Sequence, residues 1–388
     1  LSRMQSENTR FDASYLTKIE SLIRFDLTHN GMTTLLKPTD SLEKATTALG
    51  PSSAWAGSGA YYVIIPKVVE TTLKVQVYSV TGTWIKTIDK IPLTGEFSAD
   101  RQQVHVASDT IHKLLFGKEG IARTRVLYTI RHKIPGKEEW TSEMWEADYD
   151  GGNSRRVLTN VGYAVTPQYF KAAPGKRPGS FFFVSYQTGQ PKIFIGSLQG
   201  NGTKRLSALP GNQLMPTLSH QRNKIAFISD VTGNPEVFVQ EFSLEEGVKG
   251  KPRQIFSARH ATQGTPSFSP NGEQVAFVSD KDGSAKIYVV DVTPPGVKLS
   301  DVKARLITRF NKGCTAPAWS PDGQKIAYSA LIAGARQIVV YDFITKKERQ
   351  LTFGSGNKEN PSWAPNSLHL VYNVGGEANS QLFFLSLN

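Results

Sequence analysis

Residues that could do chemistry occur in this chain, but few stand at spacings that a known mechanism uses. Zinc peptidases place two histidines four residues apart around a glutamate, and the sequence has no such pair. His105 and His112 lie seven residues apart on an expected helix, a spacing that predicts two surface residues rather than a metal pair. No metal site is therefore predicted from the seven histidines, which are His29, His105, His112, His132, His220, His260 and His369.

Signatures of covalent catalysis and of nucleotide cofactors are also missing. The chain has no Gly-x-Ser-x-Gly nucleophile motif, although one class of serine peptidases carries a repeat domain with similar turns beside its hydrolase domain. It has no phosphate-binding loop and no dinucleotide fingerprint. The single cysteine, Cys314, excludes an intramolecular disulfide. We therefore expect no catalytic residue and no cofactor.

Two aspartates follow matching strands. Asp230 ends the run Ile-Ser-Asp, and Asp280 ends the run Val-Ser-Asp. Repeated carboxylates at one end of repeated units could hold a cation, because hard cations need several oxygen ligands. Alternatively, each carboxylate accepts hydrogen bonds from its own glycine-containing turn, which is a common role of aspartate. We favour the second interpretation.

The elements around these residues repeat along the chain. Proline opens a strand at Pro167, Pro216, Pro266, Pro317 and Pro361, so that successive copies are 49, 50, 51 and 44 residues apart. The clearest copies read PSFSPNGEQVAFVSD, PAWSPDGQKIAYSA and PSWAPNSLHLVYNV. Near-constant spacing of this size indicates repeated supersecondary units, none of which can bury its apolar face alone.

Each unit is expected to contain four short strands. A Ser-Pro-Asp/Asn-Gly turn is followed by an alternating strand, a second polar turn, a third strand and a fourth strand of basic and apolar residues. Counting the third strands gives six units. This pattern favours a six-bladed β-propeller over a solenoid, and over a β-sandwich, which has no reason to reuse one motif.

Residues 1–117 have a different pattern, which predicts a small α/β domain. We expect helices over 12–30 and 102–116, and strands near 61–65 and 73–78. The all-β propeller would then span 118–388. The polar stretch over 1–10 has no apolar spacing, so we expect it to be mobile or loosely packed.

The net charge of +12 falls mainly on the predicted propeller. Residues 1–117 hold 12 basic and 11 acidic residues, which leaves 33 basic and 22 acidic residues, or +11, for 118–388. Such a surface favours anionic or acidic partners, whereas nucleic acid is not expected without an aromatic stacking platform. No apolar run approaches the roughly 18 residues of a membrane helix, so the protein is expected to be peripheral to a membrane and not to span it.

The join between the two predicted domains resembles a known family. The segment LFGKEGIARTRVLY at 115–128 is similar to the domain-junction signature of the TolB family, the periplasmic β-propeller component of the Tol–Pal envelope system. The segment RQQVHVASD at 101–109 is similar to the helix that precedes that junction, and IRFDLTHNG at 23–31 to the family's first helix and its stop. With the repeats, the resemblance covers nearly all 388 residues.

The resemblance implies a non-enzymatic periplasmic scaffold. It implies that one mouth of the propeller channel binds the peptidoglycan-associated lipoprotein Pal, and that the N-terminal end contacts inner-membrane Tol proteins. In the family, partner contacts lie in loops just before the repeated proline, which correspond here to Asn212, Met215, Gly264 and Thr265. Repeat symmetry adds Thr315, Ala316, Glu359 and Asn360.

A function of another class is a propeller enzyme or lectin that acts on envelope glycans. It would require converging carboxylates in the channel and a pocket closed at one end.

The last repeat ends early. Family members usually continue past the sixth third strand with a further fourth strand and a further proline strand that complete the ring. Only five copies of each occur before Asn388. We therefore expect either a truncated chain or a ring that closes with a blade short of strands.

Overall fold

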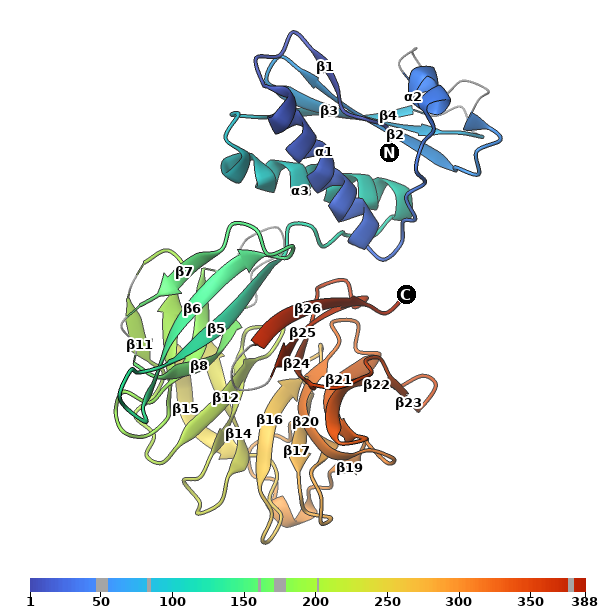
Figure 1. Ribbon diagram of the computed structural model, residues 1–388. Coiled ribbons are helices and arrows are strands. Elements are labelled where there is room, and N and C mark those ends of the chain that lie inside the picture. Colours follow the sequence, from blue (N-terminus) through green and yellow to red (C-terminus); the bar gives the residue numbers. More distant parts are fainter. Residues whose placement is uncertain (47–54, 82–84, 160–161, 171–178, 201, 376–379) are drawn as a thin grey trace. The chain divides into compact units, whose positions relative to one another are not determined.

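A computed structural model describes residues 1–388 except 47–54, 82–84, 160–161, 171–178, 201 and 376–379 (Figure 1). The described chain divides into two compact units. The first comprises residues 1–124, 148–153 and 388, and the second comprises 125–147 and 154–387. The domain boundary expected at residue 117 remains a prediction. No helix among the described residues has the length and apolar character needed to cross a membrane.

The first unit is an α/β domain built on a four-stranded sheet in the order β1-β2-β3-β4. Strand β1 pairs in parallel with β2, and β2, β3 and β4 form an antiparallel meander. Helices α1 and α3 pack against each other, and apolar side chains of both join those of the sheet in one core. The elements are β1 (Gln5–Glu7), α1 (Ala13–His29), α2 (Asp40–Thr46), β2 (Tyr62–Val69), β3 (Thr72–Ser79), β4 (Ile85–Pro92) and α3 (Phe97–Phe116).

The two long helices begin and end where the sequence predicts, apart from the start of α3. The Asp12 carboxylate accepts a hydrogen bond from the Tyr15 amide at 2.7 Å and so caps the start of α1. Helix α3 begins five residues before the predicted start, with the Glu96 side chain as its cap. It ends at Gly117, whose φ of 67° is a left-handed conformation that suits glycine. Strand β4 and helix α2 were not predicted.

The junction signature is explained by one buried carboxylate in the first unit. Asp109 accepts hydrogen bonds from the amide of Ala122 at 2.8 Å and from Arg123 Nε at 2.9 Å. A side chain at Gly120 would collide with the Asp109 carboxylate and lie 3.1 Å from its Cα. The chain can therefore fold back over α3 only with glycine at this position.

The expectation that residues 1–10 are mobile or loosely packed is wrong. Leu1 is only 8% exposed and belongs to the core of the first unit. The amide of Ser2 donates to the Ile64 carbonyl at 3.0 Å, and Gln5–Glu7 pair with the edge of β2. Strand pairing uses backbone groups, so the polar side chains of this segment do not oppose docking.

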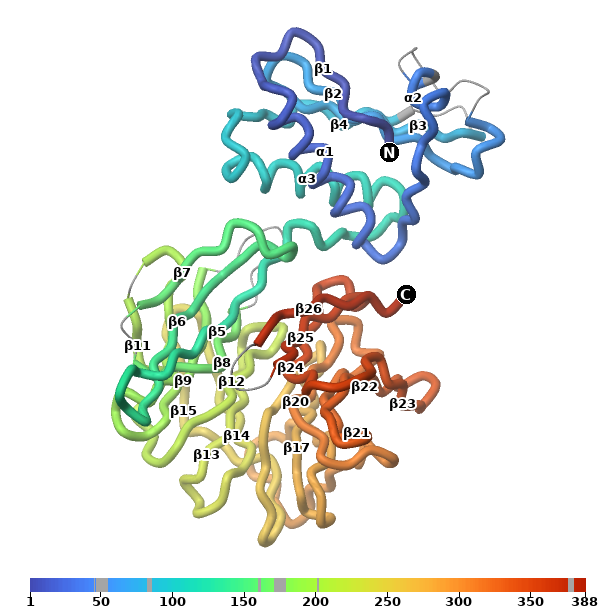
Figure 2. The backbone as a smooth tube through the Cα atoms, viewed as in Figure 1, coloured from blue at the N-terminus to red at the C-terminus, as the bar shows by residue number. Residues whose placement is uncertain are grey.

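The second unit contains six β-sheets, through which the chain passes one after another (Figure 2). The predicted fold class, a small α/β domain followed by a six-bladed β-propeller, is confirmed. The first and last sheets are β5 (Arg125–Lys133), β6 (Trp140–Asp148), β7 (Arg155–Leu158) and β24 (Asn357–Trp363), β25 (His369–Gly375), β26 (Ser380–Ser386). The four sheets between them are β8 (Ala164–Tyr169), β9 (Ser180–Ser185), β10 (Lys192–Ser197), β11 (Thr203–Arg205); β12 (Gln213–Leu218), β13 (Lys224–Ser229), β14 (Glu236–Ser243), β15 (Gly247–Gln254); β16 (Gln263–Phe268), β17 (Gln274–Ser279), β18 (Lys286–Asp291), β19 (Arg305–Leu306); and β20 (Lys312–Trp319), β21 (Lys325–Ile332), β22 (Ala335–Asp342), β23 (Lys347–Gln350).

The first strands of successive sheets are neighbours, which makes them the innermost strands of the ring. They are β8, β12, β16, β20 and β24. Apolar clusters join adjacent sheets: Phe227 packs with Phe182 of the preceding sheet, and Phe277 packs with Ile228 in the same way. Each repeat therefore buries its apolar face only against its neighbour, as the spacing predicted.

Two sheets have three strands among the described residues. Strand β5 packs against β8 as β13 packs against β16, so β5 occupies the place of a second strand. Its sheet thus has no described inner strand, and the sheet of β24–β26 has no described fourth strand. The sequence contains five copies of the inner, proline strand and five of the fourth strand. These two shorter sheets are the ones without a described sixth copy.

Candidate partner-binding site

Every described inner strand carries the same distortion at its repeated proline. The residue before each proline has a positive φ, although it is never glycine. A residue that precedes proline normally adopts an extended conformation with negative φ, so the recurrence is a property of the repeat. The angles are 52°, 52°, 42°, 51° and 55° at Thr166, Met215, Thr265, Ala316 and Asn360.

Strand pairing shows that each distortion is a β-bulge. In β12, Leu214 pairs with Ile228 and Thr217 pairs with Ala226, so two residues of the inner strand face one residue of its partner. The same offset occurs in the other four inner strands. The residue that faces the bulge is aromatic in every copy, namely Phe183, Phe227, Phe277, Tyr328 and Tyr372.

The two residues of each bulge differ in their exposure to solvent. Proline has no amide hydrogen, so it can occupy the unpaired position without losing a ladder hydrogen bond. Pro216, Pro266, Pro317 and Pro361 are buried. The residue before each proline remains exposed or half-buried, with Met215 at 37%. A positive φ at a non-glycine residue costs about 1–3 kcal/mol, so the ring maintains five such strained positions.

The predicted contact residues gather at these bulges but do not lie in loops. Met215 lies in β12, Gly264 and Thr265 in β16, Thr315 and Ala316 in β20, and Glu359 and Asn360 in β24. The loop placement was wrong for these seven, because the inner strand begins before the bulge and continues through it. Asn212 alone precedes its strand. Thr166, the fifth bulge residue, was missed because its repeat is faint, although Pro167 marked the position.

Asp230 and Asp280 anchor the start of two inner strands. The Asp230 carboxylate accepts from the Asn212 amide at 2.7 Å and from Asn212 Nδ2 at 2.6 Å. Asp280 accepts from the amide and hydroxyl of Thr262 at 2.7 and 2.9 Å. These contacts support the interpretation that the repeated aspartates are hydrogen-bond acceptors, although the donors stand 18 residues earlier rather than in the following turn. Asn212 is thereby an anchoring residue.

Short polar contacts connect neighbouring bulges. The amide of Thr265 lies 3.1 Å from Met215 Sδ, which links β16 to β12. Arg336 donates to Thr315 Oγ1 at 3.3 Å and forms a 3.1 Å ion pair with Glu359, so it bridges β20 and β24. No sequence signal indicated Arg336, which comes from the third strand of its sheet.

The side chains at the five bulges are neutral, which limits the chemistry that they can perform. Threonine, methionine, alanine and asparagine provide shape and hydrogen bonds rather than acid–base groups. Cys314 lies beside them but is fully buried, and burial raises the pKa of its thiol to about 11. A protonated thiol is a poor nucleophile at neutral pH. The arrangement therefore suits binding.

Comparison with known proteins decides the family. A model of the TolB beta propeller domain matches residues 112–388. A protein TolB homolog of Protochlamydia amoebophila (strain UWE25) is 51% identical over 360 residues, which cover 91% of this chain and 77% of that protein. The chain belongs to the TolB family.

Other members of the TolB family show the same relation. A protein TolB homolog of Chlamydia abortus is 41% identical over 272 residues, and the match covers 70% of this chain and 62% of that relative's length. The crystal structure of TolB from Acinetobacter baumannii superposes with a TM-score of 0.76 at 21% identity, covering 99% of this chain and 91% of that one. This likeness shows that the fold is shared.

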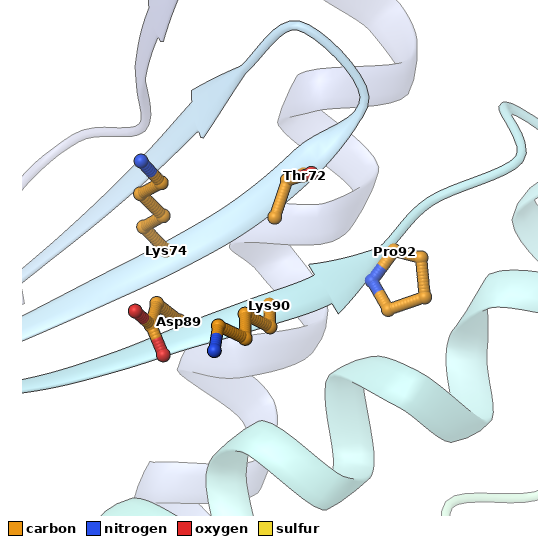
Figure 3. A pocket seen from close by; sticks show the side chains of 5 residues that line it. All are labelled: Thr72, Lys74, Asp89, Lys90 and Pro92. Atoms are coloured by element: carbon orange, nitrogen blue, oxygen red, sulfur yellow. The ribbon is translucent and has the colours of Figure 1, made fainter.

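The first unit of this TolB family member has a depression on its sheet, at a further β-bulge (Figure 3). It measures about 460 Å³ and is lined by residues of β3 and β4. Asp89 and Lys90 together face Lys74, because the pairing shifts between Leu73 and Val75. The lining is Thr72, Lys74, Asp89, Lys90 and Pro92.

Proposed function

We propose that this protein is a non-enzymatic periplasmic scaffold of a Tol–Pal cell-envelope system. The bulged inner strands would bind the peptidoglycan-associated lipoprotein Pal, and the N-terminal end would contact the inner-membrane Tol proteins. The observation that carries the proposal is the ring of five bulges in a chain of the TolB family.

The geometry of the ring supports a binding role. The strained backbone at each bulge is repeated on neighbouring strands, so accessible side chains from several sheets can meet one segment of a partner. Strain at recurrent positions is typical of functional sites. The excess of basic residues over 118–388 favours a partner with an acidic surface.

The rival function, a propeller enzyme or lectin, finds less support. Glu359 is the one carboxylate among the eight predicted contact residues, and it is paired with Arg336. The described bulges offer no second carboxylate, and acid–base hydrolysis of glycans uses two.

A single charged substitution tests the proposed site. Thr265→Arg places a long cation at the bulge of β16, where a partner would have to bury it, so we expect Pal binding to weaken by about 2 kcal/mol or more. Isothermal titration calorimetry with the soluble domain of the same organism's Pal measures this change.

The matched control is Thr203→Arg. Thr203 is exposed on β11, the outermost strand of its sheet, so this variant should bind within about 0.5 kcal/mol of the parent. Equal affinity of both variants for Pal would show that Pal does not bind at the bulges. Failure of the parent to bind Pal at all would reject the proposed function.

A further inference from the structure

The two ring nitrogens of a buried histidine in the first unit have different surroundings. His105 is fully buried on α3, where the surface position expected from the sequence was wrong. Its Nδ1 lies 2.9 and 3.1 Å from the carboxylate oxygens of Asp26 on α1. Because carboxylate oxygens accept hydrogen bonds, Nδ1 carries the proton in this pair.

The other ring nitrogen is an uncompensated acceptor. In the neutral ring, a protonated Nδ1 leaves a lone pair on Nε2, and that atom has no hydrogen-bond partner among the described residues. A buried polar atom without a hydrogen-bond partner destabilises the folded protein, so this lone pair is expected to bind a ligand.

The carboxylates of two aspartates lie close to this histidine. One ligand atom from each of His105, Asp148 and Asp150 lies within 4.8 Å of the other two. The Asp148 side chain is fully buried, and that of Asp150 is 8% exposed. Both aspartates belong to the 148–153 segment of the first unit.

The cluster is rich in carboxylates, the groups that bind hard and borderline cations. Three carboxylates gather here, those of Asp26, Asp148 and Asp150, and Arg101 contacts two of them. Arg101 Nε lies 3.5 Å from Asp148 Oδ2, and its terminal nitrogen pairs with Asp150. A cation that binds the two aspartates would therefore compete with Arg101 for them.

We propose that His105, Asp148 and Asp150 form a binding site for a divalent transition-metal cation of the zinc type. Zn²⁺ binds both imidazole nitrogen and carboxylate oxygen, and three protein ligands leave the fourth position of a tetrahedral site to water. Asp26 accepts from the opposite ring nitrogen, which is the usual way in which a protein orients a ligating histidine. Tyr149 donates to Asp26 at 2.8 Å and completes this support.

The test uses the full chain after treatment with a chelator. Titration with ZnCl₂ in a calorimeter should show one site that His105→Asn abolishes, and Asp26→Asn should weaken binding by about 10–100-fold. Arg101→Gln removes the competing cation and should tighten binding. Co²⁺ added to the parent should give a visible absorption band that Asp150→Asn removes. This second variant changes a residue that is less buried than His105, so it guards against misfolding.

His112 provides the matched control. It is 2% exposed on the same helix, and its Nδ1 also has no hydrogen-bond partner among the described residues. It does not belong to the cluster of potential ligands, so His112→Asn should bind Zn²⁺ as the parent does. Stoichiometric binding that survives in folded His105→Asn, or a parent that takes up no Zn²⁺, would overturn the proposal.

Discussion

At the scale of single residues, the bulged ring combines one backbone conformation with four kinds of side chain. Thr166, Met215, Thr265, Ala316 and Asn360 share a φ between 42° and 55°. None of the four kinds is glycine, the residue that this conformation favours. Because proline normally favours negative φ in the residue before it, the conformation must come from the strand pairing and packing of the bulge against the aromatic residue that faces it.

The strain at the bulge can be measured by substituting two alanines of β20. Ala316→Gly should leave the stability unchanged or raise it by up to about 1 kcal/mol, because relief of about 1–2 kcal/mol of left-handed strain offsets the entropy cost of glycine, about 1 kcal/mol. Ala318 is also half-buried in β20 but is paired normally with Ala327. Ala318→Gly should therefore destabilise by about 1 kcal/mol. Urea unfolding compares the two, and destabilisation of similar size in both variants would show that the bulge is unstrained.

Sequence reasoning found four of these five positions, all except Thr166, but not their geometry. The prolines marked the bulges, yet a residue before proline is expected to be extended, so the positive φ and the strand placement were not foreseen. His105 was more difficult, because Asp26 and Asp148 lie in distant parts of the chain. Spacing along one helix carries no information about such partners.

At the scale of elements, local signals predicted the helices well and the edge strands poorly. Asp12 and Gly117 mark helix ends by capping, which depends on neighbouring residues alone. Strand β4 reads IKTIDKIP, whose pattern is interrupted by the bulge at Asp89 and Lys90. Strand β1 is polar and short, and it is fixed by β2, which lies more than 50 residues away.

The docked start of the chain makes a prediction at this scale. Leu1→Ser should lower the free energy of unfolding by about 2 kcal/mol, because it removes a buried apolar side chain from the core of the first unit. Arg3→Ser is the control, since the Arg3 side chain is 72% exposed and its ion pair with Asp40 is worth at most about 1 kcal/mol. Differential scanning calorimetry measures both. A Leu1→Ser protein as stable as the parent would mean that this segment adds nothing to the core.

At the scale of the whole molecule, the repeat length and the number of third strands predicted a six-bladed ring. Adjacent sheets share apolar cores, so each unit must present the same apolar face to the next. This requirement explains why the repeat is clear in the sequence. The two shorter sheets depart from this regularity. No residue of β5 is buried, whereas four of the six residues of β17, the matching strand of another sheet, are buried.

Hydrogen exchange should register this difference. Strand β5 pairs only with β6 among the described residues, whereas β17 has a partner on each side. We expect the amides of 125–133 to exchange much faster than those of 274–279 in the native protein. Mass spectrometry of peptides from the two strands tests this, and equal protection would show that β5 is shielded as a central strand.

The bulges also bear on how such a surface changes over evolutionary time. The proline and the aromatic residue that faces it recur at all five bulges, whereas the accessible residue before the proline differs from sheet to sheet. The sheets thus share one backbone conformation and present four kinds of side chain on it. Exchange of threonine for methionine or asparagine at one bulge can therefore adapt the surface to a changed partner one sheet at a time, while the backbone of the ring stays the same.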